Sequence, residues 1–490
     1  MDVNLFLISL FGLGWIILYK SKTERYYGTF YIMRSNYGMR LISSIANLAP
    51  SLWRFLADFS IFLSFGGLGG YYLSKDDLSR GNFRKSFLVL GFLAVITAFF
   101  SGYSITFAAG SSLLVLMAYA MSGRMRSTIV DFTLSSIIMS VITYLPTNNM
   151  LLSVFVGVFG LPALLIYALT SHGITILYGE TDLPGVSPLL PSSREGNIGV
   201  AFPGYDLFIP WWYALLAIII TLGSHEISHG VLTRVCGVKL KSTGLLTIGS
   251  FPIGAFVEPD EDELNKRSGL DRMRVYTMGS FANFAVGITS VLVILLAMSL
   301  LSNHMVYNGV RIVGFIEGYP AEEYLAKDSI IHSINSMPLS NVEGFLNATS
   351  SLKAGERVTL NTSSGVRSFT MAENPTEPGK GYMGVYVTDD VSFTGLMGFI
   401  STSYVSVFLK ALEWIIFFNI NIGLVNLLPL LPFDGGRMFK ELVYSTKLRE
   451  LDVKRIMYTI IVFTVVVFIV NVIPLFQMIV LKAYDILGLN

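Results

Sequence analysis

Charge is scarce in this chain. Of its 490 residues, 14% are Asp, Glu, Lys or Arg and 53% are hydrophobic, whereas soluble domains carry about 25% charged residues. The apolar residues gather in runs long enough to cross a bilayer, which takes about 20 residues for each helix. The composition therefore excludes an ordinary soluble protein and predicts a multi-pass protein embedded in a lipid bilayer.

Cysteine and net charge are nearly absent as well. The single cysteine, Cys236, excludes an internal disulfide and a zinc site made of cysteines. The net charge of +1 predicts no nucleic-acid partner. The first apolar run, Leu5–Tyr19, lacks a basic start and a small-residue cleavage site, so we expect a retained span and no signal peptide.

Long apolar runs define the expected architecture. They predict a polytopic α-helical membrane protein of about eight to ten transmembrane helices. The stretch 86–171 is broken by Gly and Ser and is long enough for three or four of them. The predicted spans are 4–20, 54–73, 86–104, 105–121, 129–146, 150–171, 210–232, 275–301, 398–424 and 457–482.

Two stretches are too polar to lie in a membrane. Residues 172–209 are rich in Pro and Gly and predict an irregular connector. Residues 302–397 alternate in polarity and predict a small α/β domain. Its expected strands and helices are Val310–Phe315, Arg357–Asn361 and Met383–Val387, then Pro320–Ala326 and Val342–Ser350.

The distribution of Lys and Arg predicts orientation. Loops 233–274 and 437–455 are basic, which places them in the cytoplasm by the positive-inside rule. Connector 172–209 and domain 302–397 carry no such excess and are predicted to be extracytoplasmic. The basic loops within 1–171 fit no single topology.

The predicted parts are an amino-terminal multi-span region (1–171), the connector (172–209), a first membrane core half (210–301), the inserted domain (302–397) and a second core half (398–490).

The motif with the clearest chemistry is HEISH at 225–229. On a helix, His225 and His229 share one face about 5–6 Å apart, so both imidazoles can bind one Zn²⁺, and Glu226 can act on a zinc-bound water. A pair of structural histidines on a polar helix face is the alternative. The motif lies within an apolar span, where ionisable residues are costly and are functional by default.

A zinc site needs a third protein ligand and an open position. Asp434 follows an apolar helix and a turn with two prolines, and precedes two glycines. Irregular backbone at membrane depth is tolerated only inside protein or beside water. Asp434 is therefore the expected third ligand, and the alternative is a solvated Asp that merely ends a helix.

Two further segments are weaker candidates. Gly279 and Asn283 lie in the span 275–301, where small and amide residues serve helix packing, which is the simpler interpretation. Residues 245–257 combine strand-forming residues with glycines. They predict either a surface hairpin or an open edge, with Gly254, Ala255 and Phe256, that binds an extended substrate by strand addition.

Together these motifs resemble the site-2 protease family of intramembrane zinc metalloproteases, from about residue 205 to the carboxyl end. The family's HExxH pattern matches His225, Glu226 and His229. Its NxxPxxxLDGG pattern matches the segment from Asn426 to Gly436, with Phe433 in place of Leu. Its GPxxN pattern matches Gly279 and Asn283, with Ser280 in place of Pro.

The inserted domain is similar to the PDZ domains of that family. The segments that carry this similarity are Gly318–Ala321, Asp328–Asn335 and Ala354–Leu360. The similarity implies a PDZ-like domain and suggests a peptide ligand for it. Residues 41–70 also resemble the amino-terminal region of archaeal members.

The resemblance implies regulated intramembrane proteolysis of single-span or otherwise membrane-embedded protein substrates. One catalytic Zn²⁺ is held by His225, His229 and Asp434, with Glu226 as the catalytic acid and base. Asn426 and Asn283 are expected to contact the substrate backbone or the developing oxyanion.

Two alternatives stay open. One is a membrane-anchored zincin that cuts misfolded proteins and uses a downstream Glu as its third ligand. The other is a transporter or receptor with a peptide-binding domain, which would function without Glu226. It predicts charges spread over the amino-terminal spans, which hold chiefly Asp58 and Asp131.

Overall fold

The structure is a computed structural model, and the parts of the chain that it describes are residues 12–13, 16, 24–26, 30–35, 37–100, 105–194, 196–248, 251–446 and 448–487. Most of the predicted span 4–20 lies outside these described residues. The chain divides into two compact units. The first unit comprises Met1–Val291 and Glu413–Asn490, and the second comprises Leu292–Leu412.

The first unit begins with a bent helix pair. Helices α2 (Tyr37–Leu48) and α3 (Pro50–Leu73) meet at 91°. Pro50 occupies the start of α3, where the missing N–H costs no intrahelical hydrogen bond. Helix α3 is central to this unit, because it contacts α2 and five later helices. Those helices are α4 (Asp77–Phe100), α6 (Thr128–Thr147), α7 (Met150–Phe159), α8 (Leu161–Leu177) and α9 (Trp211–Val235).

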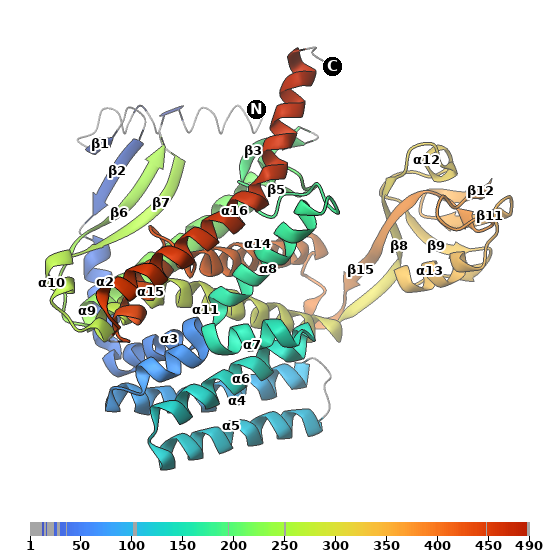
Figure 1. The fold of residues 1–490 in the computed structure, drawn as a ribbon. Coiled ribbons are helices and arrows are strands. Elements are labelled where there is room, and N and C mark those ends of the chain that lie inside the picture. Colours follow the sequence, from blue (N-terminus) through green and yellow to red (C-terminus); the bar gives the residue numbers. More distant parts are fainter. Residues whose placement is uncertain are drawn as a thin grey trace. The chain divides into compact units, whose positions relative to one another are not determined.

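Helices α3 to α7 pack in layers, drawn in blue and teal in Figure 1. Helix α5 (Ile105–Met125) packs on α4, and α6 packs on both α3 and α7. Between α3 and α4, the rings of Phe62, Phe83 and Phe87 form edge-to-face contacts with centroids 4.8 to 5.8 Å apart. Such aromatic contacts add to the apolar burial that holds the layers together.

The prediction of one span over 150–171 is wrong. The structure has two shorter helices there, α7 and α8, separated at Gly160. The backbone φ of Gly160 is 78°, a conformation that glycine adopts easily because it lacks a Cβ. Pro162 then lies in the first turn of α8, where proline starts a helix but cannot continue one.

The connector 172–209 is also more regular than predicted. Helix α8 extends to Leu177, and a three-stranded antiparallel sheet of order β3-β4-β5 follows. These strands are β3 (Leu190–Arg194), β4 (Asn197–Ala201) and β5 (Phe208–Pro210). Strands of three to five residues are too short to display an alternating pattern, which is why the sequence indicates only turns here.

The hairpin predicted over 245–257 is present. Strand β6 (Leu240–Ile248) pairs antiparallel with β7 (Phe251–Pro259) directly after α9. Two strands from the start of the chain, β1 (Glu24–Tyr26) and β2 (Phe30–Ser35), extend the sheet on its β6 side. The order is β1-β2-β6-β7, so within the described residues β7 has an unpaired edge.

The remaining helices complete the first unit. They are α10 (Glu261–Asn265), α11 (Gly269–Ser302), α14 (Thr402–Asn426), α15 (Asp434–Tyr444) and α16 (Glu450–Leu487). Helices α11 and α14 continue into the second unit. Helix α15 is amphipathic, with Met438 and Leu442 four residues apart in one apolar face that is buried in the unit's core.

The described chain is mainly helical. Five of its helices are long and apolar enough to cross a membrane, or six if α2 and α3 count as one bent span. This is fewer than the predicted eight to ten helices, in part because α7 and α8 have only 10 and 17 residues. The five helices are α6, α9, α11, α14 and α16.

The second unit contains a sheet of order β12-β11-β9-β8-β15, with β10 paired to β9. Its strands are β8 (Met305–Phe315), β9 (Ile330–Ile334), β10 (Met337–Pro338), β11 (Arg357–Thr362), β12 (Gly365–Thr370) and β15 (Val385–Phe393). The other elements are α12 (Pro320–Tyr324), α13 (Val342–Ser350), the short pair β13 (Ala372–Glu373) and β14 (Gly381–Tyr382), and the 3₁₀ turn η1 (Gly395–Met397). Alternate residues of β11 are buried, as expected for a strand with one face on a core.

Candidate metal centre

Three side chains from distant parts of the sequence meet in the first unit. His225 and His229 lie one turn apart on α9, and Asp434 is the first residue of α15. Oδ2 of Asp434 lies 3.1 Å from Nε2 of His225 and 3.0 Å from Nε2 of His229. The two Nε2 atoms are 3.1 Å apart. Among the described residues, no other three His, Cys, Asp or Glu side chains are grouped closely enough to hold a metal ion.

The spacing of these atoms fits zinc. Zinc binds imidazole nitrogen and carboxylate oxygen at about 2.0–2.2 Å in tetrahedral geometry, which places neighbouring ligand atoms about 3.3 Å apart. The observed separations of 3.0 to 3.1 Å are close to that value. Two neutral imidazoles and one carboxylate also leave the fourth tetrahedral position free, as a catalytic site requires.

One face of α11 supports both histidines. Val275, Gly279 and Asn283 are spaced by four residues and therefore lie along the same side of the helix. A Cβ at Gly279 would lie 2.3 Å from Nε2 of His229 and 2.5 Å from Nε2 of His225. Only glycine leaves room at position 279 for both imidazoles.

The hydrogen bonds of the histidines orient their rings. Nδ1 of His229 donates to the carbonyl of Val275 at 2.7 Å, which leaves the lone pair of Nε2 facing Asp434. Nδ1 of His225 lies 3.3 Å from the amide nitrogen of Asn283, which is fully buried. Turning that amide by 180° exchanges its oxygen and nitrogen, so that Oδ1 can accept the Nδ1 proton of His225.

Asp434 is held by close backbone packing. The turn between α14 and α15 contains Pro429 and Pro432, which prevent either helix from continuing. The first turn of α15 then rests on this segment, since a Cβ at Gly435 would lie 2.2 Å from the carbonyl oxygen of Leu427. The glycine after Asp434 is thus required for this close approach.

Two ion pairs on α11 connect the site to other helices. Arg274 binds Asp58 of α3 through two hydrogen bonds, of 2.8 and 3.1 Å, and also donates to Ser79. Arg272 binds Glu441 of α15 through two hydrogen bonds of 2.8 Å. The first pair fixes the helix that carries Val275, and the second connects it to the helix that begins with Asp434.

Glu226 lies between the histidines in sequence and contacts the edge strand. Its Oε2 accepts a hydrogen bond of 2.9 Å from the backbone N–H of Val257 on β7. The next residue of that strand, Glu258, accepts from Ser242 and Arg34, and these bonds hold the pKa of its carboxyl below the usual range. The carboxylate of Glu226 is therefore anchored to the hairpin.

The other predicted residues lie near this centre without joining it. Gly254, Ala255 and Phe256 lie on β7 beside Val257. Asn426 is the last residue of α14, partly buried, on the same turn as Asp434. The expected substrate contact of Asn283 stays a prediction, because its nearest polar atoms belong to His225 and Ser224.

The sequence agrees with a known family over this region. Residues 213–477, more than half of the chain, match the family model described as Peptidase family M50. The chain belongs to this family. Family M50 is the site-2 protease family, so the resemblance inferred from the motifs is confirmed. Its members are zinc metalloproteases of membranes, and with the apolar helices this indicates a multi-pass membrane metallopeptidase.

The chain is also similar to an uncharacterised protein of the archaeon Methanocaldococcus jannaschii. The two are 27% identical over 244 residues, which is 49% of this chain and 60% of that relative. The match thus spans less than two thirds of the relative.

Several contacts at this centre are not predicted by the sequence. The carbonyl of Val275 and the N–H of Val257 are backbone groups and give no signal in the residue type. The spacing of Gly279 and Asn283 by four residues does indicate a site, because it places the space left by a glycine and a side-chain amide on the same helix face. For Arg272 and Arg274, the sequence predicts only that they add to the positive charge of the loop 233–274.

Proposed function

We propose that this M50 peptidase is an intramembrane zinc endopeptidase that cuts peptide bonds in or near transmembrane segments of other proteins. The meeting of His225, His229 and Asp434 within 3.1 Å carries the proposal. Its setting supports a reaction at the membrane, since α9 is an apolar helix of 25 residues. The biological role that we assign is regulated intramembrane proteolysis.

His225, His229 and Asp434 are the residues that hold the zinc ion in this proposal. When bound, zinc supplies the Lewis acidity that activates water and polarises a peptide carbonyl. The carbonyl of Val275 and the amide of Asn283 position the imidazoles, with their Nε2 lone pairs toward the ion. Asn283 is then a positioning residue, whose burial leaves no surface for substrate.

Glu226 moves the protons. As a carboxylate next to His225 on the same helix, it accepts a proton from the attacking water and delivers it to the leaving amine. The hydrogen bond from Val257 fixes one carboxylate oxygen and leaves the other available. Asn426, at the end of α14, is the proposed partner for the substrate backbone or the oxyanion.

The substrate has to be extended where it is cut, because a helix hides its carbonyls in internal hydrogen bonds. The unpaired edge of β7 is the proposed binding strand. In an antiparallel sheet, alternate residues direct their backbone groups to the same edge. Since the N–H of Val257 points to Glu226, Ala255 presents its N–H and C=O to that same edge. Gly254 and Phe256 flank it.

The proposed orientation places the active site toward the cytoplasm. The basic loops at 233–274 and 437–455 adjoin α9, α11, α15 and α16 and support this side. The inserted domain at 302–397 is then extracytoplasmic. We assign to it a PDZ-like fold and a peptide ligand, supported by its sheet with two short helices. The proposed partners are a single-span or otherwise membrane-embedded protein substrate and the lipid bilayer.

The decisive experiment measures zinc content and cleavage of a model single-span substrate in detergent. We expect one zinc per chain in the wild type, no cleavage by Glu226→Gln with zinc retained, and loss of zinc in Asp434→Asn. Glu180→Gln, an equivalent change at an exposed residue, serves as control and should cleave normally. Full cleavage by Glu226→Gln would overturn the mechanism, and normal zinc in Asp434→Asn would remove Asp434 from the ligand set.

A further inference from the structure

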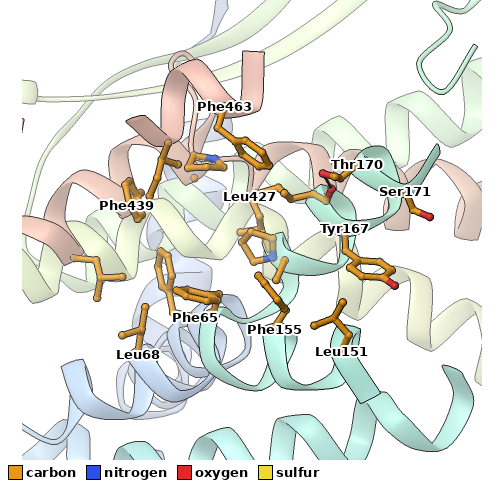
Figure 2. A pocket seen from close by; sticks show the side chains of 18 of the residues that line it. Phe65, Leu68, Leu151, Phe155, Tyr167, Thr170, Ser171, Leu427, Phe439 and Phe463 are labelled. Carbon is orange, nitrogen blue, oxygen red and sulfur yellow. Dashed lines mark hydrogen bonds between the residues drawn. The ribbon is translucent and has the colours of Figure 1, made fainter. Parts of the chain in front are cut away.

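A cavity of about 530 Å³ lies next to the turn that carries Asp434. Its walls come from helices α3, α7, α8, α15 and α16 and from the segment between α14 and α15. Figure 2 shows side chains from these elements, among them Phe65, Phe155 and Phe439, facing a common space. All of these elements belong to the first unit.

The lining of the cavity is apolar. It contains no charged side chain, and two of its three hydroxyl groups have partners, while the third belongs to the exposed Ser171. Thr170 donates to the carbonyl of Ile166, and the hydroxyl of Tyr167 accepts from the amide of Asn149. A charged or strongly polar ligand would lose its hydration here and gain few hydrogen bonds in return, at a cost of several kcal/mol. The chemistry of the lining therefore selects a hydrocarbon.

The size of the cavity suits a single flexible chain. Its volume of about 530 Å³ lies within the range of about 300–1,000 Å³ that small-molecule sites occupy.

The mouth of the cavity opens on the apolar outer surface of the helices. Leu151, Phe155 and Phe463 line it, yet they are 58%, 46% and 47% exposed. Phe463 belongs to α16, one of the helices that can cross a membrane. In a bilayer, the medium at this surface is lipid hydrocarbon. A ligand of this cavity would therefore enter from the lipid bilayer.

The floor of the cavity is the backbone next to Asp434. Leu427, Pro429 and Gly435 form it. Because Gly435 packs closely on the backbone of Leu427, a displacement of this floor would also move the neighbouring Asp434. A chain that fills the cavity supports this turn from behind, whereas an empty cavity leaves its lining without packing contacts on one side.

We propose that this cavity binds one acyl chain of a membrane lipid, and that the bound chain holds the Asp434 turn in the conformation that the metal site needs. The first statement is independent of catalysis. The second rests on the proposed function, because it assigns Asp434 to the zinc ion.

The binding test uses vesicles of phosphatidylcholine with a photoactivatable diazirine on one acyl chain. Crosslinks in the wild type should map to peptides that contain Phe155, Phe439 or Phe463. Ala163→Phe places a ring in the cavity and should reduce labelling to background. Ala168→Phe, the same change at an exposed position of the same helix, should label as the wild type does.

Leu151→Trp narrows the mouth from an exposed position and gives a second variant with an intact core. It should also reduce labelling. Equal labelling of wild type, Ala163→Phe and Leu151→Trp would overturn lipid binding. Because labelling needs neither zinc nor a substrate, this result does not depend on the protease proposal.

The coupling test measures zinc affinity before and after delipidation in detergent. Removal of lipid should weaken zinc binding by wild type about 10-fold, the scale for loss of groups that orient ligands. Phosphatidylcholine should restore it. Ala163→Phe, in which the ring replaces the chain, should not respond to delipidation. A wild type whose zinc affinity is unchanged by delipidation would overturn the coupling.

Discussion

Arg272 and Arg274 lie two residues apart on α11, and each forms a two-point ion pair with a carboxylate on another helix. The Arg274–Asp58 pair is almost fully buried, with side-chain exposures of 6% and 0%. The Arg272–Glu441 pair is more accessible, at 22% and 17%. The buried pair joins α11 to α3, and the accessible pair joins α11 to α15, the helix that begins with Asp434.

This difference extends to the surroundings of each half of the metal centre. The two histidines have polar partners on α11, the carbonyl of Val275 and the amide of Asn283. Helix α11 is in turn joined to α3 through the hydroxyls of Ser60 and Thr277, which lie 2.5 Å apart. The Asp434 half rests on a turn with an apolar cavity behind it. We infer a rigid histidine platform and a more adjustable third ligand.

The largest effect is expected at Asp58. Asp58→Asn removes the buried counter-charge of the Arg274 guanidinium and leaves it only the more exposed Asp271. This should lower the free energy of unfolding by about 3 kcal/mol, the lower end for a broken buried pair. Thermal unfolding in detergent, followed by circular dichroism, measures the change. The double variant Asp58→Leu/Arg274→Met removes both charges and should recover most of the loss. If Asp58→Asn alone were neutral, the histidine half would not be the rigid one.

Gly279→Ala tests the contact between α11 and the two imidazoles. Its methyl group would overlap both Nε2 atoms, so we expect zinc affinity to fall by about 100-fold or more. The control is Gly223→Ala on α9, where a Cβ meets nothing within 4 Å. Zinc titration by competition with a chromogenic chelator measures both. Equal affinities would show that the imidazoles bind metal elsewhere.

Asn283→Ala removes the amide beside His225 without filling space. Loss of a group that orients a ligand weakens metal binding by about 10- to 100-fold. Asn283→Asp, which can still accept the Nδ1 proton, should retain more of the affinity than Asn283→Ala does. The visible spectrum of the cobalt-substituted protein should change in Asn283→Ala, because it reports ligand geometry. An unchanged spectrum would show that Asn283 serves only helix packing and does not orient His225.

The smallest effect is expected at Glu441. Glu441→Gln weakens a partly solvated ion pair, and we expect a loss of about 1 kcal/mol in the free energy of unfolding. Glu450→Gln, at an exposed pair with Lys454, is the control and should show no measurable change. If Glu441→Gln lowered the free energy of unfolding as much as the Asp58 variant does, the two ion pairs would not differ in strength as we infer.

The parts of the site that depend on side-chain identity were predictable. The helix predicted over 210–232 is α9, and its two histidines meet Asp434. The turn at Asp434 follows from its prolines and glycines, whose backbone constraints are local. The contacts of Val275 and Val257 were not predictable, because their backbone groups do not depend on the side chain.

Parts of the fold escaped prediction for similar reasons. Strands β1 and β2 join the hairpin from about 200 residues away in the sequence, and the residues 24–35 alone do not indicate their pairing partner. The break at Gly160 interrupts a run whose hydrophobicity is continuous, so the pattern of apolar residues alone predicts one helix. In both cases tertiary contacts decide between conformations that the local sequence permits.

The separation of 205 residues between His229 and Asp434 has a consequence for synthesis. Ribosomes add about 5–20 residues per second, so about 10 to 40 s pass between the two residues. During that interval the inserted domain is made, and the nascent chain holds both histidines without their carboxylate partner. A growing chain therefore completes its candidate metal centre only after the inserted domain has been made.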